Sequence, residues 1–160
     1  MLTLLALMLG LAAGEPQVAA SGTIVTADEI AATLKASIAN NTVDSPIKLA
    51  QLPGGHKASV ALLRRTKAET SALIHDDVTE IYEIVEGSGT LITGGTLMDP
   101  KESDLTRVNA GMSHTGMHHG GEARRVKAKD IIIVPAGMAH RFSELDGPIV
   151  YQVYRFEPKR

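Results

Sequence analysis

Short apolar runs that end in turn residues dominate the chain after about residue 46, and they constrain its fold more than any other feature. The run from Ile47 to Leu52 ends at Pro53-Gly-Gly55, and the run from Glu80 to Val85 ends at Glu86-Gly-Ser-Gly89. Similar runs cover Ala58 to Leu63, Thr90 to Thr93, Ile131 to Val134 and Ile149 to Phe156. Runs of this length between Gly and Pro clusters are typical of β-strands. The pattern predicts an all-β sandwich or barrel.

One helix is expected before the strands. The segment Thr26-Ala-Asp-Glu29 has the form of a capping box, and Ile30, Leu34 and Ile38 recur at helical spacing. A length of 160 residues suits a single domain. We therefore expect the helix and covering strands within residues 21–56, and the barrel within residues 57–157.

The first 20 residues have the pattern of a signal peptide. Met1 to Ala13 is an apolar run too short to span a bilayer, and Val18-Ala-Ala20 offers small residues before a cut at Ser21. No Lys or Arg precedes the run, so a buried N-terminal helix or a misplaced start remains an alternative. The signal-peptide interpretation predicts a periplasmic or secreted protein, and the alternatives predict a cytoplasmic one.

Composition excludes several classes of function. The net charge of −2 favours neither nucleic acid nor an anionic membrane surface as a partner. The chain has no Cys, which excludes a lipoprotein anchor, disulfides, thiolate metal sites and cysteine nucleophiles. Any metal must therefore be held by nitrogen and oxygen atoms, and no stable membrane anchor is expected.

Three side chains at the edges of predicted strands form a candidate metal site. His75 and Glu80 flank the start of one strand, and His140 follows the turn Pro135-Ala-Gly137. Two imidazoles and one carboxylate suit a transition metal with open coordination positions. In a strand, residues two apart share a face. If Glu80 points inward, Tyr82 points inward with it, while the outward Ile81 and Val85 need cover from a second sheet or a partner subunit.

These residues carry a resemblance to the cupin superfamily, whose small barrels are double-stranded β-helices, also called jelly rolls. The first cupin motif has a His-x-His pair, a Glu three or four residues later, and a Gly after six more; here His75, Glu80 and Gly87 keep that spacing. The second motif ends in Pro-x-Gly-x-x-His, which Pro135-Ala-Gly137-Met-Ala-His140 matches. Lys129 stands where the second motif usually begins with Gly. The resemblance covers roughly residues 57–156 and implies a single-domain cupin barrel.

The chain departs from the cupin pattern at one ligand. The resemblance implies three His and one Glu, but only one His of the first pair is present. If His75 is the second of that pair, Leu73 replaces the first; if His75 is the first, Asp77 replaces the second. The expected ligands are then His75, Glu80 and His140, with Asp77 as a fourth candidate. Iron, manganese and zinc all suit such a nitrogen and oxygen set. An unpaired buried carboxylate would be costly, which also favours a metal.

Two further features have open roles. Tyr82 is either a core aromatic residue or a proton donor beside the metal, and we take Tyr82 and Glu80 as the catalytic candidates. The polar, Gly-rich stretch from Met98 to Arg125 is expected to be a long loop. Its histidines, His114, His118 and His119, are either solvated or part of a lid.

The leading functional prediction is a divalent-metal enzyme acting on a small organic molecule. It would work either as a dioxygenase or as a Lewis-acid isomerase or lyase. The alternative is a non-catalytic, exported cupin that binds a small ligand or a metal. A third interpretation is a structural jelly roll that acts through dimerisation, since the resemblance implies pairing through sheet faces or N-terminal segments. A homodimer is expected in each case.

Overall fold

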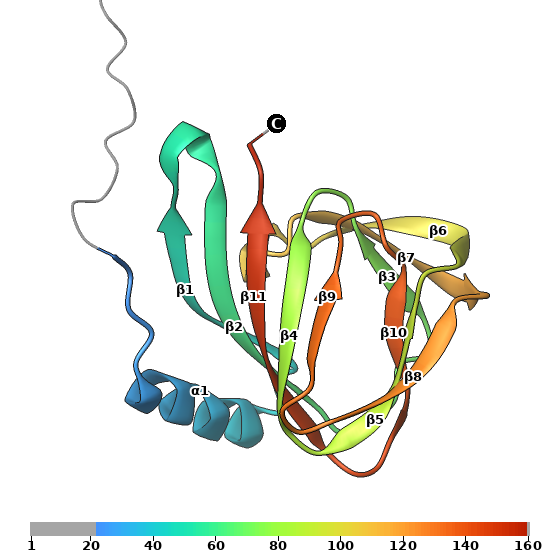
Figure 1. Ribbon diagram of the computed structural model, residues 1–160, viewed down its shortest axis with the longest axis horizontal. Coiled ribbons are helices and arrows are strands. Elements are labelled where there is room, and N and C mark those ends of the chain that lie inside the picture. Colours follow the sequence, from blue (N-terminus) through green and yellow to red (C-terminus); the bar gives the residue numbers. More distant parts are fainter. Residues whose placement is uncertain (1–21, 160) are drawn as a thin grey trace, which may run out of the picture.

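Two antiparallel sheets face each other in the computed structural model, which describes residues 22–159 (Figure 1). The predicted signal peptide, residues 1–20, lies outside the described residues. The five-stranded sheet has the order β1 (Asp44–Gln51), β2 (Lys57–Arg65), β11 (Ile149–Glu157), β4 (Thr79–Glu86) and β9 (Ile131–Val134). The six-stranded sheet has the order β6 (Thr96–Asp104), β7 (Met112–His119), β3 (Ala72–His75), β10 (His140–Leu145), β5 (Ser88–Thr93) and β8 (Glu122–Lys127). This arrangement is the jelly-roll barrel that the sequence predicts.

The predicted N-terminal helix is confirmed as α1 (Ala27–Asn40). Its capping box is complete, because the Thr26 hydroxyl accepts a hydrogen bond from the Glu29 N–H and the Glu29 carboxylate accepts one from the Thr26 N–H. The helix ends at Asn41, whose backbone is left-handed, and it packs against β1 and β2. No helix within residues 22–159 is long and apolar enough to cross a membrane.

The core lies between the two sheets and follows the alternation expected for β4. Glu80, Tyr82 and Ile84 are buried, whereas Ile81 and Val85 are 36% and 46% exposed on the outer face. The buried cluster consists of Ala61, Leu63, Tyr82, Ile84, Leu91, Val126, Val134, Phe142, Ile149, Tyr151 and Val153. The barrel is thus filled by aliphatic residues and three aromatic rings, and one end of it receives the polar side chains described below.

The expected loop from Met98 to Arg125 is a wrong prediction, because most of it is strand. β6 and β7 pair from Thr96 with His119 to Asp104 with Met112, and β8 pairs with β5. β6 and β8 are largely exposed and β7 is mostly half-buried, so apolar residues do not mark their alternation. Two parts of the stretch have no strand: the turn at residues 120–121, and the connection between β6 and β7, residues 105–111, which contains the short 3-10 helix η2 (Thr106–Val108). A second 3-10 helix, η1 (Pro53–Gly55), joins β1 to β2.

Candidate metal centre

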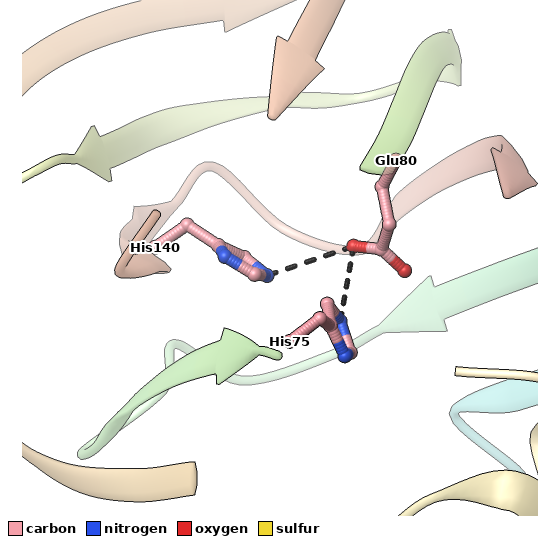
Figure 2. A group of neighbouring side chains, drawn as sticks. All are labelled: His75, Glu80 and His140. Carbon is pink, nitrogen blue, oxygen red and sulfur yellow. Dashed lines mark ion pairs between the residues drawn. The ribbon is translucent and has the colours of Figure 1, made fainter. Parts of the chain in front are cut away.

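His75, Glu80 and His140 meet inside the barrel from three different strands (Figure 2). His75 is the last residue of β3, Glu80 is the second residue of β4, and His140 is the first residue of β10. The Glu80 Oε2 atom lies 3.3 Å from His75 Nε2 and 3.6 Å from His140 Nε2. One ligand atom from each side chain lies within 4.8 Å of the others, and all three side chains are buried. The sequence separates these residues by up to 65 positions, and strand pairing brings them together.

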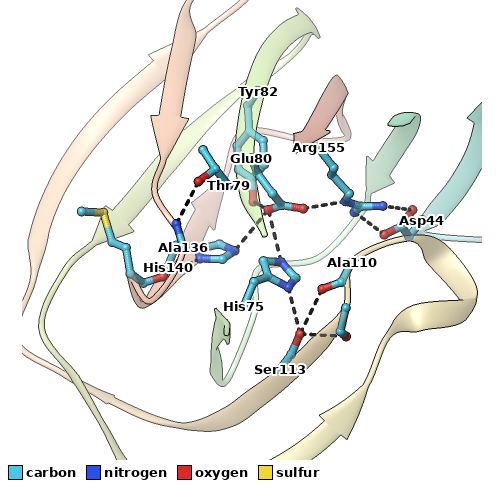
Figure 3. Close-up of polar contacts among 12 residues, drawn as sticks. Asp44, His75, Thr79, Glu80, Tyr82, Ala110, Ser113, Ala136, His140 and Arg155 are labelled. Atoms are coloured by element: carbon cyan, nitrogen blue, oxygen red, sulfur yellow. Dashed lines mark hydrogen bonds and ion pairs between the residues drawn. The ribbon is translucent and has the colours of Figure 1, made fainter. Parts of the chain in front are cut away.

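The Pro135-Ala-Gly137 turn fixes the two histidine-bearing segments relative to each other. Gly137 has φ +78°, a left-handed backbone conformation that favours glycine, and its N–H donates to the His75 carbonyl at 2.8 Å. The Ala136 N–H donates to Thr79 Oγ1 at 3.2 Å (Figure 3). The turn therefore holds the backbone of one ligand directly and contacts the residue before another.

Two positions around the motifs explain why glycine is usual there. Gly87 has φ +83°, and a Cβ atom at this position would lie 2.3 Å from the Pro148 carbonyl oxygen. Lys129 has φ +79°, although it carries a side chain. The usual glycine of the second motif thus corresponds to a left-handed residue, and in this chain a lysine adopts that conformation at some energetic expense.

Hydrogen bonds at Nδ1 orient both imidazoles. His140 Nδ1 lies 3.0 Å from the Met138 carbonyl, which can only accept, so Nδ1 carries the proton. His75 Nδ1 lies 2.9 Å from Ser113 Oγ, and that hydroxyl is within 3.3 Å of the Ala110 carbonyl. When Ser113 donates to this carbonyl, its oxygen accepts the proton of His75 Nδ1. Burial also lowers the pKa of His140. Both Nε2 atoms then present lone pairs toward Glu80.

Arg155 is the charged partner of Glu80 and was not identified from the sequence. Its Nε donates to Glu80 Oε1 at 2.8 Å, and its Nη2 donates to Asp44 Oδ2 at 2.6 Å (Figure 3). Burial alone would raise the pKa of Glu80, but His75 and the Arg155 guanidinium beside the carboxylate more than offset it, so this pKa lies well below its usual range. The cost of an unpaired carboxylate, on which the sequence argument relied, therefore does not apply to Glu80.

A signal for Arg155 was present in the alternation of the last strand. Tyr151, Val153 and Arg155 are two residues apart and all point inward, while Tyr154 and Phe156 between and after them are exposed. A charged residue in phase with inward apolar residues indicates a buried ion pair.

Tyr82 contacts the same carboxylate from within its own strand. Its hydroxyl donates to Glu80 Oε2 at 2.6 Å, and its ring packs at 4.9 Å, centroid to centroid, from the ring of Tyr151. Burial and the neighbouring Glu80 charge raise the pKa of Tyr82 well above its usual value. The hydroxyl therefore remains protonated, and it acts as a hydrogen-bond donor at the cluster.

Leu73, rather than Asp77, occupies the place of the absent motif histidine. Leu73 and His75 lie two apart in β3, and Leu73 pairs with His140 across the sheet. Leu73 also lines the same cavity as His75, Glu80 and His140. Asp77 lies in the connection between β3 and β4 and is not a member of the cluster. The cluster thus has an apolar side where a fourth ligand would otherwise lie.

The three histidines of β7 lie outside the cluster. His114 Nδ1 is 2.9 Å from Asp76 Oδ1, and both side chains are partly exposed. His118 Nε2 donates to the Gly94 carbonyl at 2.7 Å, and His119 is exposed. Among residues 22–159, His75, Glu80 and His140 form the group of candidate ligands, and no β7 histidine joins them.

The donor set fits one divalent metal ion. Ligand atoms about 2.1 Å from a single ion lie roughly 3.0–3.4 Å apart at tetrahedral or octahedral angles. The separations of 3.3 and 3.6 Å at Glu80 Oε2 are close to this range. Hydrogen bonds donated by the Nδ1 atom, as in both imidazoles here, are the usual way that proteins orient histidine ligands. The residues present could therefore hold a metal, with two nitrogen atoms and one oxygen atom.

A cavity of about 360 Å³ opens beside the cluster, a volume in the range of small-molecule sites. Leu63, Leu73, Val43, Leu105 and Val108 supply apolar wall, and Arg65, Arg107 and Arg155 supply positive charge. The connection between β6 and β7 forms part of this wall. The cavity therefore adjoins the side of the cluster that Leu73 leaves without a ligand.

Comparison with known proteins supports the fold. No model of a known protein family matches the chain, and no curated protein sequence does. The protein BH2720 from Bacillus halodurans is similar over 89% of this chain and 87% of its own, with 17% identity and a TM-score of 0.51. The cupin protein BF4112 from Bacteroides fragilis aligns over 62% of this chain and 65% of its own (17% identity, TM-score 0.41). Hydroquinone 1,2-dioxygenase from a Sphingomonas species aligns over 64% of this chain and 60% of its own (11% identity, TM-score 0.45).

The likeness to BH2720 extends over nearly the whole of both chains and concerns the fold alone. The chain spans less than two thirds of BF4112 and of the dioxygenase. The two facing sheets and the turn at Gly137 agree with the fold that the cupin motifs imply. So do the inward positions of His75, Glu80 and His140. The chain has a jelly-roll barrel fold, which is the fold that its resemblance to the cupin motifs implies.

Proposed function

We propose that this protein is a divalent-metal-dependent enzyme that acts on a small organic molecule. The observation that supports it is the convergence of three lone-pair atoms, His75 Nε2, His140 Nε2 and Glu80 Oε2, at 3.3 and 3.6 Å. Atoms of this kind repel one another unless a proton or a cation lies between them. Iron, manganese or zinc would meet this requirement with preferred ligand types.

When bound, such a metal supplies either adjacent open positions for dioxygen and substrate or Lewis-acid polarisation of a carbonyl group. The protein's own residues bind and orient the substrate. The Tyr82 hydroxyl oxygen lies 2.6 Å from Glu80 Oε2 on the cavity wall, and its proton can turn from Glu80 to a substrate oxygen. Leu73 and Leu63 keep the adjoining wall apolar. The choice between dioxygenase and isomerase or lyase chemistry depends on the substrate.

The first test is the metal content of natively purified protein. We expect about one equivalent of a divalent transition metal by mass spectrometry, and its loss in His75→Ala and Glu80→Gln. His119→Ala is the matched control, because His119 is an exposed histidine of β7 outside the cluster. If the purified wild type contains no stoichiometric metal, and a metal-free sample takes up no Mn²⁺, Fe²⁺ or Zn²⁺, the proposal fails.

Arg155 supports a second candidate, a non-catalytic barrel that binds a small ligand. Because Arg155 and Tyr82 already satisfy both oxygens of Glu80, the carboxylate is stable without a metal. This candidate predicts ligand binding without turnover across a panel of carbonyl and phenolic compounds. Turnover that disappears in Glu80→Gln would exclude it and favour the enzyme.

A further inference from the structure

The connection between β6 and β7 is tied to the candidate ligands at two points. Glu80 accepts a hydrogen bond from Arg155, and the Nη1 of Arg155 donates to the Val108 carbonyl at 2.6 Å. His75 is bonded to Ser113, whose hydroxyl is 3.3 Å from the Ala110 carbonyl. The connection also closes on itself, because the Leu105 N–H donates to the Gly111 carbonyl at 3.0 Å. Its residues therefore have a defined position beside the cavity.

Most of the ionisable side chains that line this cavity have partners within the protein. Arg155 pairs with Glu80 and Asp44, and Arg65 pairs with Glu69 at 2.9 Å. The Asp104 carboxylate accepts hydrogen bonds from the N–H and the hydroxyl of Thr106, at 2.9 and 2.6 Å. Each acidic residue on the wall thus accepts at least one hydrogen bond within the protein.

Arg107 is the exception. It lies in η2 on the cavity wall, it is exposed, and within residues 22–159 it forms no ion pair or side-chain hydrogen bond. A guanidinium presents two parallel N–H groups that match a carboxylate. The backbone of η2 places this unpaired cation on the wall of a cavity whose acidic residues already have partners, and this leaves an unfilled position for an anion.

We propose that the cavity binds a small organic carboxylate, whose carboxylate group pairs with Arg107 and whose apolar body lies against Leu73, Leu63 and Leu105. This assignment rests on the proposed function, because it names the substrate class of the same site. Arg107 is a binding residue in this proposal and takes no part in holding the metal. The anion would enter beside η2 and extend toward the cluster.

The test measures binding of matched carboxylate and amide pairs by calorimetry. The probes are acetate and acetamide, butyrate and butyramide, and benzoate and benzamide, which differ in charge but little in size. We expect at least one carboxylate to bind about tenfold or more tightly than its amide, as a charge-assisted pair requires. Arg107→Ala should lose that difference, and Arg107→Lys should keep part of it.

Arg124→Ala is the control, since it removes the same charge from an exposed residue of β8. The proposal is overturned if no carboxylate binds more tightly than its amide, or if Arg107→Ala binds carboxylates as the wild type does. Repeating the titrations after metal removal separates the two proposals. Arg107-dependent binding in protein that takes up no metal supports the anion site and refutes the metal; one bound metal without carboxylate preference does the reverse.

Discussion

Arg155 and Glu80 form a buried ion pair in which the Arg155 Nε lies 2.8 Å from Glu80 Oε1, on the side of the carboxylate that faces away from both imidazoles. Because of this pair, the two oxygen atoms of Glu80 have different contacts. Oε1 is occupied by the guanidinium, and Oε2 faces His75 and His140. A metal bound at Oε2 would therefore receive a single oxygen from Glu80, and Arg155 positions that oxygen.

The first prediction concerns the loss of this guanidinium. Arg155→Met leaves the buried Glu80 and the partly buried Asp44 without their cation, so we expect the free energy of unfolding to fall by about 3–5 kcal/mol. Chemical denaturation in the presence of a chelator measures this. Added Zn²⁺ should restore part of the stability in the variant, because a metal would neutralise Glu80. Arg124→Met, which breaks an exposed pair with Glu122, should cost less than about 1 kcal/mol.

The second prediction concerns stability in acid. Burial holds the pKa of His140 below its ordinary 6.5, so below that pH the unfolded chain binds a proton that the folded chain does not. The pKa of Glu80 is depressed from 4.5, so its contribution is present above pH 4.5 and is lost as the pH falls through the folded-state pKa. Both effects have the same sign. We expect metal-free protein to lose stability below about pH 6.5 and more steeply below about pH 4.5.

Urea denaturation at pH 7.5, 5.5 and 4.0 checks this dependence. His140→Gln should flatten the change between pH 7.5 and 5.5, and Glu80→Gln should flatten the change below pH 4.5. His119→Gln, an exposed histidine, serves as the control. A wild type whose stability is constant from pH 7.5 to 5.5 would contradict the assignment of a neutral, buried His140.

The sequence predicted the fold and the three candidate ligands because their signals are local. Apolar runs between turn residues marked most strands of the barrel core, and ligand spacing near Gly87 and Gly137 is set by the turns themselves. The capping box that begins at Thr26 predicted the helix for the same reason. Local patterns of this kind can be recognised without knowing which strand pairs with which.

The features that the sequence did not reveal depend on contacts between distant or exposed segments. Arg155 and Glu80 are 75 residues apart in the sequence, and no local pattern near either residue identifies the other as its partner. β6 and β7 pair through their backbones and bury little, so their polar residues resemble a loop. The choice between Leu73 and Asp77 needed the end of β3, which strand pairing determines.

A third prediction follows from Leu73. Leu73→His would place an imidazole two residues before His75 on the same face of β3, and we expect tighter metal binding than in the wild type. Competition with a chromophoric chelator measures the Zn²⁺ dissociation constant. Ile74→His is the matched control, because it adds a histidine one residue away on the opposite face. Equal affinity in the Leu73 variant and the wild type would place the metal elsewhere.

A fourth prediction concerns Lys129, which adopts φ +79° with a side chain. Replacing it with glycine removes the steric cost of the left-handed conformation, so Lys129→Gly should raise the free energy of unfolding by about 1 kcal/mol. Thermal and urea denaturation check the sign. Lys127→Gly in β8 should instead lower stability, because glycine weakens a strand. A destabilised Lys129→Gly protein would show that the lysine side chain makes a compensating contribution.

The last prediction concerns the outer face of the five-stranded sheet. Ile133, Ile81 and Tyr154 are neighbours across β9, β4 and β11, and they are 63%, 36% and 36% exposed. A groove of about 310 Å³ beside them, which also includes Phe156, is lined largely by apolar atoms. Contiguous apolar surface of this kind is typical of an interface. We expect a homodimer through this face.

Light scattering at micromolar concentration measures the mass of the assembly. The wild type should have the mass of two chains, and the double variant Ile81→Lys, Ile133→Lys should have the mass of one. Met117→Lys tests an exposed apolar residue of β7 on the other sheet, and it should leave the dimer intact. A monomeric wild type would refute the interface, whereas a dimer that persists in the double variant would move it to another surface. The variants also separate assembly from the site, because Ile81 and Ile133 point away from Glu80 and should leave metal content unchanged.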